Sequence, residues 1–254
     1  MNRLQSELHR LYLPHAAGAQ DTDVEESSLT DANGQVRSMV LELSGPADWD
    51  ALSKVWQGVQ GDLDLPAPAI AVTGLDGYQL WFSLAEPLPA PQAMAFLESL
   101  RVRYLSDIAP KRVVLMPSVD VMTPRQVLHA RLVPALQAHT GNWSAFVAPD
   151  LAPVFADAPW LDIPPNAEGQ SNLLSRLQSI KPADFQIALD RLRPAMMPTL
   201  AEPASLPPDT AVACQNPKRF LINVMTDEAV ALGLRIEAAK ALLPYFEDHP
   251  SLRQ

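Results

Sequence analysis

The side chains that most often carry out enzyme chemistry are few in this sequence and form no recognisable set. A single cysteine, Cys214, excludes an intramolecular disulfide and any zinc site that needs several thiolates. The sequence also lacks the glycine-rich dinucleotide and phosphate-loop motifs, the Gly-x-Ser-x-Gly nucleophile motif and the His-Glu-x-x-His zinc motif. The five histidines have no ligand spacing, so we interpret them as ordinary surface or core residues: His9, His15, His129, His139 and His249. Common hydrolase and dehydrogenase activities are therefore not expected.

Four basic residues lie near one another in the sequence and have side chains of the kind that binds phosphate: Arg101, Arg103, Lys111 and Arg112. Tyr78 and Trp81 carry rings on which nucleic-acid bases can stack. The alternative interpretation is that the cations are solvated residues near a helix end and that Trp81 belongs to the core. The formal charge of −10 argues against broad coating of a phosphate backbone, so we expect at most weak, salt-sensitive binding of DNA or nucleotide.

The composition is that of a globular protein with enough apolar residues for a sizeable core. Of 254 residues, 48% are hydrophobic and 19% are charged. No stretch approaches the roughly 20 apolar residues of a membrane span, and the N-terminus lacks the apolar run of a secretory signal. We therefore expect a cytoplasmic protein without a membrane partner.

Residues 36–117 alternate between segments typical of strands and segments typical of helices. Apolar runs of strand length lie at 36–44, 69–73, 78–84 and 113–116. The turn from Gly74 to Gly77 joins the second and third runs into a hairpin. A helix capped by Asp48 separates the first two runs, and a helix carrying Met94 to Tyr104 separates the last two. The order β-α-β-β-α-β predicts an α/β protein of the α+β class, with a split sheet of the ferredoxin or RNA-recognition type and two helices on one face.

Further helices are expected before and after this central unit. Residues 4–12 have apolar side chains at helical spacing, and residues 167–179 and 182–192 carry two more apolar faces that should pack on the sheet. Thr123 to Gln126 has the form of a helix-capping box, although Pro134 makes the following segment ambiguous. Residues 140–166 are rich in proline and tryptophan and are expected to be irregular.

The sequence predicts three parts. Residues 1–192 form the α/β domain with its helical extension, and residues 193–215 have the proline-rich composition of an extended linker. Residues 216–254 form a tail whose two expected helices make a helical hairpin. About 30 residues cannot bury a core alone, so this tail is expected to dock on the body, on a copy of itself or on a partner.

The most distinctive segment is 68–87, which reads Pro-Ala-Ile-Ala-Val-Thr-Gly-Leu-Asp-Gly-Tyr-Gln-Leu-Trp-Phe-Ser-Leu-Ala-Glu-Pro. It resembles the second motif of the archaeo-eukaryotic primase and primase-polymerase superfamily, where a Ser/Thr-Gly turn and a Gly-aromatic-His-Leu-Trp-Phe strand precede Glu-Pro and a helix. The resemblance covers about residues 36–120 and implies a palm domain, with Thr73, Gly74 and Gln79 at phosphate-binding positions. Gln79 stands where the family has histidine, and a neutral amide contributes no positive charge to phosphate binding.

The acidic motifs that hold divalent metal ions in that superfamily are incomplete in this sequence. Glu42 and Ser44 occupy the place of an Asp-x-Asp pair, and Asp120 is the candidate for the third acidic position. Two-metal phosphoryl transfer needs several converging carboxylates, so the resemblance implies a degenerate palm with vestigial Glu42, Gln79 and Asp120 and no resident cofactor. The sequence Asp62-Leu63-Asp64 lies between a helix end and a Leu-Pro turn and is interpreted as a loop.

A second resemblance lies in the tail, over residues 220–227 and 234–246. These segments are similar to a short helical module of phage terminase small-subunit-like and related mobile-element proteins. The resemblance implies a gene of a phage or mobile element. The alternative is an amphipathic helical hairpin that docks locally.

Three functions follow as hypotheses. The first is a catalytically degenerate primase-like protein that binds nucleic acid or nucleotide, or recruits partners, in DNA replication or packaging. The second is an active, Mg- or Mn-dependent nucleotidyltransferase that uses Glu42, Asp120 and Asp76 as metal ligands. The third is a pure interaction protein in which the tail forms the interface. An unrelated ferredoxin-like domain is the alternative to all readings that depend on the resemblance.

Overall fold

The computed structural model describes residues 2–14, 29–31, 33–119, 127–193, 235–236 and 239–240. The chain divides into two units, Met1–Met197 and Pro198–Gln254. Asp120, the capping-box residues 123–126, the expected linker and most of the tail lie outside the described residues. The four described tail residues are helical, in agreement with the helices expected in this tail.

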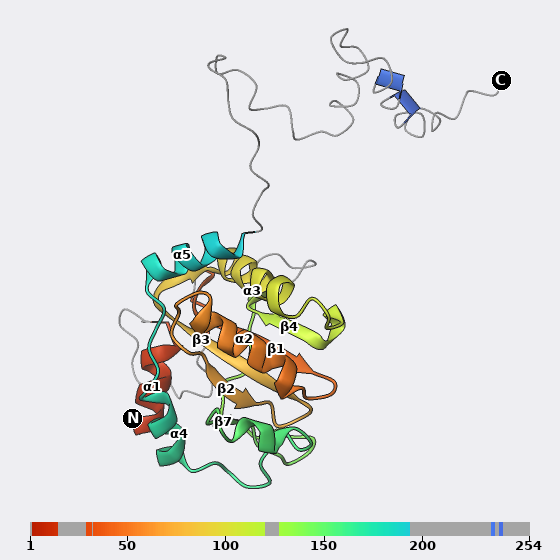
Figure 1. Ribbon diagram of the computed structural model, residues 1–254. Coiled ribbons are helices and arrows are strands. Elements are labelled where there is room, and N and C mark those ends of the chain that lie inside the picture. The colour runs from red at the N-terminus through yellow and green to blue at the C-terminus, as the bar shows by residue number, and fades with distance from the viewer. Residues whose placement is uncertain are drawn as a thin grey trace, which may run out of the picture. The chain divides into compact units, whose positions relative to one another are not determined.

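A five-stranded antiparallel sheet forms the centre of the first unit, with the strand order β4-β1-β3-β2-β7 (Figure 1). Its strands are β1 (Gln35–Ser44), β2 (Ala69–Val72), β3 (Gly77–Pro89), β4 (Val113–Met116) and β7 (Ala145–Val147). Helix α2 (Trp49–Gly61) links β1 to β2, and α3 (Ala90–Tyr104) links β3 to β4, so each crossover spans one intervening strand. The predicted α+β class and the split β-α-β order of the first four strands are thus confirmed.

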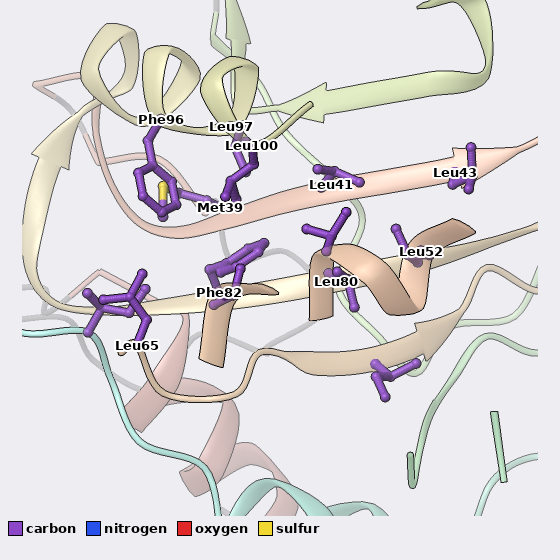
Figure 2. Close-up of a cluster of buried hydrophobic side chains, with 14 of the residues drawn as sticks. Met39, Leu41, Leu43, Leu52, Leu65, Leu80, Phe82, Phe96, Leu97 and Leu100 are labelled. Carbon is purple, nitrogen blue, oxygen red and sulfur yellow. The ribbon is translucent and has the colours of Figure 1, made fainter. Parts of the chain in front are cut away.

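One face of the sheet is covered by α2 and α3, which lie side by side in Figure 1. Alternate residues of β1 and β3 point into this layer because side chains of a strand alternate between faces. Figure 2 shows the resulting core, in which side chains of the strands meet those of the helices: Met39, Leu41, Leu43, Leu80 and Phe82 face Leu52, Phe96, Leu97 and Leu100. Helix α5 (Pro182–Leu192) joins this core by packing Phe185 on Phe96, with ring centroids 4.8 Å apart.

Local sequence accounts for the start of α2 and for the close pairing of β1 with β3. The side chain of Asp48 accepts a hydrogen bond from the Ala51 amide at 2.9 Å, which caps the helix as predicted. Gly77 is opposite Ser44, and a Cβ at Gly77 would lie 2.6 Å from the Leu43 carbonyl oxygen. Only glycine allows the two backbones to approach this closely.

The other face of the sheet is also covered, by helix α1 (Arg3–Leu11), helix α4 (Ala167–Leu174) and residues 129–136. Helices α1 and α4 lie side by side in Figure 1. The core on this face contains Leu4, Leu8, Leu11, Tyr12, Val40, Trp81, Phe146 and Leu174. The guanidinium of Arg37, which is only 3% exposed, donates to carbonyl oxygens at the end of α1 and fixes that helix to β1.

Two expectations for residues 140–192 were wrong in detail. Residues 145–147, expected to be irregular, form β7. The segment after the capping box, which the sequence left ambiguous, contains strand β6 (Val127–Leu128), and this pairs with β5 (Ser118–Val119). Helix α4 ends at Leu174 rather than near 179, because the chain must become extended to reach β3. There the amide of Ile180 donates to the Ser83 carbonyl at 2.8 Å, and the Ala85 amide donates to the Ile180 carbonyl at 2.9 Å.

Short 3-10 helices complete the unit, at η2 (Pro110–Arg112) and η3 (Ala152–Phe155). None of the helices in the described part of the chain is both long and apolar enough to cross a lipid bilayer.

Candidate functional site

Glu42 and Gln79 are brought together by the pairing of β1 with β3. The two residues are direct partners in the register, and both side chains lie on the face that α1 and α4 cover. The Gln79 amide Nε2 donates to Glu42 Oε2 at 2.7 Å. The two positions that the resemblance singles out are therefore adjacent, and β3 lies inside the sheet.

The amide of Gln79 is occupied at both ends. Its Oε1 accepts a hydrogen bond from the indole Nε1 of Trp81 at 2.8 Å, while its Nε2 serves Glu42. Gln79 is 8% exposed and Trp81 is fully buried. A buried indole N–H needs an acceptor, and Gln79 supplies it. The side chain predicted to contact phosphate therefore has a structural task in this fold.

The carboxyl group of Glu42 lies in an acidic environment. Burial raises its pKa, the hydrogen bond from Gln79 lowers it, and the nearby Asp76 carboxylate raises it further. Two carboxyl groups at this end of the sheet repel a triphosphate rather than attract it. Among the residues that the structure describes, no group of three or more His, Cys, Asp or Glu side chains could hold a metal ion. Asp120 lies outside those residues.

The Thr73-Gly74 turn, predicted to cradle phosphate, is closed by other parts of the chain. The Thr73 hydroxyl accepts from the amides of Leu75 and Gly77, both at 3.1 Å. The Gly74 amide donates to the Pro159 carbonyl at 3.0 Å, and Gly74 has φ +80°. Because the Gly74 amide already has this partner, the predicted phosphate contact at the turn is not open in this structure.

The basic residues do not form one phosphate-binding surface. Arg101 and Arg103 belong to α3, on the sheet face opposite Gln79, and pair with Glu98 and Asp62. Arg112 donates to the carbonyl oxygens of Ser44 at 3.2 Å and Pro46 at 2.7 Å, which ties the β1–α2 connection to η2. Lys111 is exposed in η2. The alternative interpretation of solvated or ion-paired cations fits these positions better.

Tyr78 and Trp81 point to opposite faces of β3, and both are 0% exposed. The Tyr78 hydroxyl donates to the Ala152 carbonyl at 2.6 Å, and burial raises its pKa to about 12. The Trp81 ring packs edge-on against Tyr12, with centroids 5.2 Å apart. The predicted stacking role of these two rings is wrong for this structure, and the core interpretation of Trp81 is the one observed.

The acidic sequence at Asp62 and Asp64 is a loop, as interpreted from its position. Asp62 caps the end of α2 and accepts a hydrogen bond from the Tyr104 hydroxyl at 2.9 Å. Arg191 donates to Asp64 Oδ2 at 2.6 Å and to the Asp62 carbonyl at 3.0 Å. These contacts fasten α2 to α3 and α5.

An apolar groove beside β7 was not predicted from the sequence. It encloses about 570 Å³, and its lining includes Phe146, Leu151, Phe155, Ile163 and Leu173. Leu151 is 51% exposed and Ile163 is 71% exposed, so the walls of the groove face solvent. The signal in the sequence was the presence of apolar residues in the proline-rich segment 140–166. That signal alone does not reveal that β7, η3 and α4 meet there.

The outer edge of β7 borders this groove, and its main-chain groups already have partners. The side chain of Gln170, which is 6% exposed, accepts from the Phe146 amide at 2.7 Å and donates to the Phe146 carbonyl at 2.9 Å. The Ala148 carbonyl accepts from the amides of Leu151 and Ala152 at 3.0 and 3.1 Å. A side-chain amide thus takes the place of a sixth strand and protects the edge.

Comparison with known proteins adds no relative to this picture. The chain matches no protein-family model, and no curated protein matches it either. The fold defines it as an α+β protein with a split β-α-β sheet that has one added strand and helices on both faces. The two resemblances drawn from sequence motifs stay predictions.

Proposed function

We propose that this chain is a catalytically inactive, palm-like protein that acts by recruiting a protein partner. The observation that carries the proposal is the double hydrogen bonding of the Gln79 amide, to Trp81 at 2.8 Å and to Glu42 at 2.7 Å. A phosphate ligand would have to displace the carboxylate of Glu42 from this amide and leave a half-buried charge without that donor. In this proposal Glu42 and Gln79 stand at positions that correspond to a palm active site, but they no longer bind metal or phosphate.

Electrostatics supports recruitment over nucleotide binding. Glu42 and Asp76 place negative charge at the end of the sheet where a triphosphate would have to lie. Arg112, whose guanidinium contacts the end of β1, is occupied by main-chain carbonyls and Asp48. Binding of nucleotide or DNA is therefore expected to be weak and to vanish with salt.

The apolar groove supports binding of a protein. Its lining is mostly apolar and includes the exposed Leu151 and Ile163, and exposed apolar grooves often mark binding sites. The resemblance of the tail to mobile-element proteins suggests the context, which is replication or packaging of a phage or integrated element.

The proposal is tested by primer synthesis and primer extension with Mn²⁺ or Mg²⁺ and labelled nucleotides, using the full chain and an active primase-polymerase as positive control. We expect no incorporation above background. Incorporation by the chain that is lost in Glu42→Gln would overturn the proposal and establish the nucleotidyltransferase alternative. A gel shift at low salt with single-stranded, duplex and primed DNA provides the second measurement, and tight binding that persists at physiological salt would also contradict it.

A further inference from the structure

The groove beside β7 has an apolar floor and walls. Phe146 of β7 and Leu173 of α4 line it together with Leu151 and Phe155, which lie at η3, and Ile163. Its volume of about 570 Å³ is within the range of sites that accept several apolar groups of a ligand. Leu151 and Ile163 are more than half exposed, so covering them would remove apolar surface from water.

Polar recognition inside the groove is limited because the Gln170 amide and the Asn166 side-chain oxygen are already bonded. The Asn166 side-chain oxygen accepts from the amides of Glu168 at 2.8 Å and Gly169 at 3.3 Å, as the N-cap of α4. Both ends of the Gln170 amide are bonded to Phe146. Sites for small polar metabolites rely on a few convergent polar groups to fix the ligand's orientation. The contacts here favour a ligand held by apolar side chains.

The closed edge of β7 excludes one common way of binding a peptide. A peptide that adds a strand to a sheet needs unpaired main-chain N–H and C=O groups along the edge. Those of Phe146 are held by Gln170, and the Ala148 carbonyl is held by two amides. The ligand must therefore satisfy its own main-chain hydrogen bonds, as an α-helix does.

The charge around the groove indicates the charge of the ligand. Residues 140–175 contain four acidic residues and no Lys, Arg or His, and the four acids are exposed: Asp150, Asp157, Asp162 and Glu168. Asp150 adjoins Leu151 and Asp162 adjoins Ile163 in the sequence, so negative charge borders the two exposed walls. Arg10 of α1, which reaches the C-terminal end of α4, is engaged there with the Leu174 carbonyl at 2.9 Å and with Glu7, and Arg176 follows that end of α4.

We propose that this groove binds a basic amphipathic helix of a partner protein. The apolar face of the helix lies on Phe146, Leu151 and Ile163, and its lysines and arginines lie against the acidic border. The inference rests on the proposed function, because it names the kind of partner that is recruited and the surface that recruits it.

The test is fluorescence anisotropy of the full chain with labelled model peptides of about 18 residues, which is about five helical turns. One peptide has leucines at helical spacing and lysines on its polar face, and the second has the same leucines with glutamates in place of lysines. A third has the composition of the first in an order that breaks the spacing. We expect saturable binding of the first peptide only, weakened several-fold by salt.

Matched variants locate the binding surface. Leu151→Glu and Ile163→Glu should each weaken binding at least tenfold, because they place a charge in the apolar contact. Ile187→Glu is the control, since Ile187 of α5 is 51% exposed, as Leu151 is, but does not line the groove. The control should bind as the unchanged chain does. All these side chains are largely exposed, so the variants should fold, and circular dichroism checks that they do.

Several results would overturn the inference. Equal binding of the basic and acidic peptides would show that the groove does not select a basic helix. Equal affinity of Ile163→Glu and Ile187→Glu for the basic peptide would show that the peptide does not bind in the groove. Dimers in light scattering that Leu151→Glu dissociates would assign the groove to a second copy of the chain. Binding of a long-chain alcohol with no peptide binding would assign it to a small apolar ligand. If no peptide binds and no nucleotide is incorporated, the groove inference is wrong but the chain can still recruit a partner through another surface. Glu42-dependent nucleotide incorporation would instead contradict the proposed function itself.

Discussion

The guanidinium of Arg37 donates to the Leu13 carbonyl at 3.0 Å, from a position in β1 that is almost fully buried. It also donates to the Arg10 carbonyl at 3.1 Å. The last carbonyl groups of a helix lack partners within the helix, and they carry partial negative charge. A residue of strand β1 therefore supplies hydrogen-bond donors to the C-terminal end of α1.

Replacing Arg37 with methionine should destabilise the fold by about 2–3 kcal/mol, because buried carbonyl groups lose charged donors. Urea unfolding followed by circular dichroism measures the change. Arg193→Met is the matched control, since the Arg193 side chain is 72% exposed and pairs with the exposed Asp190 in the preceding turn of α5. The control should change the free energy of unfolding by less than about 0.5 kcal/mol. Equal effects of the two substitutions would contradict the role of Arg37.

Gln79→Leu should destabilise the fold by about 1–3 kcal/mol, because the Trp81 indole N–H and the Glu42 carboxylate both lose their partner. The indole N–H resonance of Trp81 should move in an NMR spectrum of ¹⁵N-labelled protein. Gln57→Leu, at an exposed position of α2, provides the control and should leave that resonance in place. An unmoved Trp81 resonance in Gln79→Leu would show that the hydrogen bond is not formed in solution.

His129 makes stability depend on pH. Burial lowers its pKa from 6.5 to about 4, the neutral ring accepts from the Ala130 amide at 2.8 Å, and its other nitrogen lies 3.1 Å from the Ser38 carbonyl. The unfolded chain binds a proton at higher pH than the folded chain does, so stability is full above pH 6.5 and falls as the pH decreases towards 4. The loss should reach about 3 kcal/mol.

Urea unfolding between pH 4 and 8 tests this prediction by comparison with His129→Gln, which keeps a donor and an acceptor but does not titrate. The difference between the two stability profiles should grow as the pH falls below 6.5. Parallel profiles would show that His129 is not the group responsible. Glu42 contributes to both profiles, and its raised pKa makes the fold more stable as the pH falls, which is opposite to the effect of His129. The difference between the two profiles cancels this contribution.

Gln170→Leu should open the edge of β7, because the Phe146 amide and carbonyl lose their only described side-chain partner. We expect a destabilisation of about 1–3 kcal/mol and faster hydrogen exchange at the Phe146 amide. Asn172→Leu is the control, since Asn172 is exposed on the same helix. An exchange rate at Phe146 that is the same in both variants would contradict edge protection by Gln170.

The sequence was most informative where structure depends on neighbours in the chain. The Gly74–Gly77 turn predicted the hairpin, the Asp48 cap predicted the start of α2, and the apolar run of residues 36–44 predicted β1. The split strand order that the sequence predicted makes β1 and β3 neighbours, and the observed register sets Glu42 opposite Gln79. These features follow from turn chemistry, capping and periodicity, which act over a few residues.

The features that the sequence did not predict depend on partners far along the chain. Strand β7 has three residues and exists because it pairs with β2, and α4 ends early because Ile180 pairs beside β3. The Gly74 amide is occupied by Pro159, and the Gln79 amide by Trp81. Proximity of Glu42 and Gln79 could be predicted from strand order, but whether their polar atoms were free could not.

The pairing of Ile180 with Leu84 affects how the first unit unfolds. Residues 175–181 connect α4, which belongs to one layer, to α5, which belongs to the other. This connection is hydrogen-bonded to β3 through Ile180, shortly before α5 begins. Separating either layer from the sheet would therefore break main-chain hydrogen bonds to a strand that both layers share. Melting of the first unit should accordingly be a single cooperative event rather than the loss of one layer followed by the other.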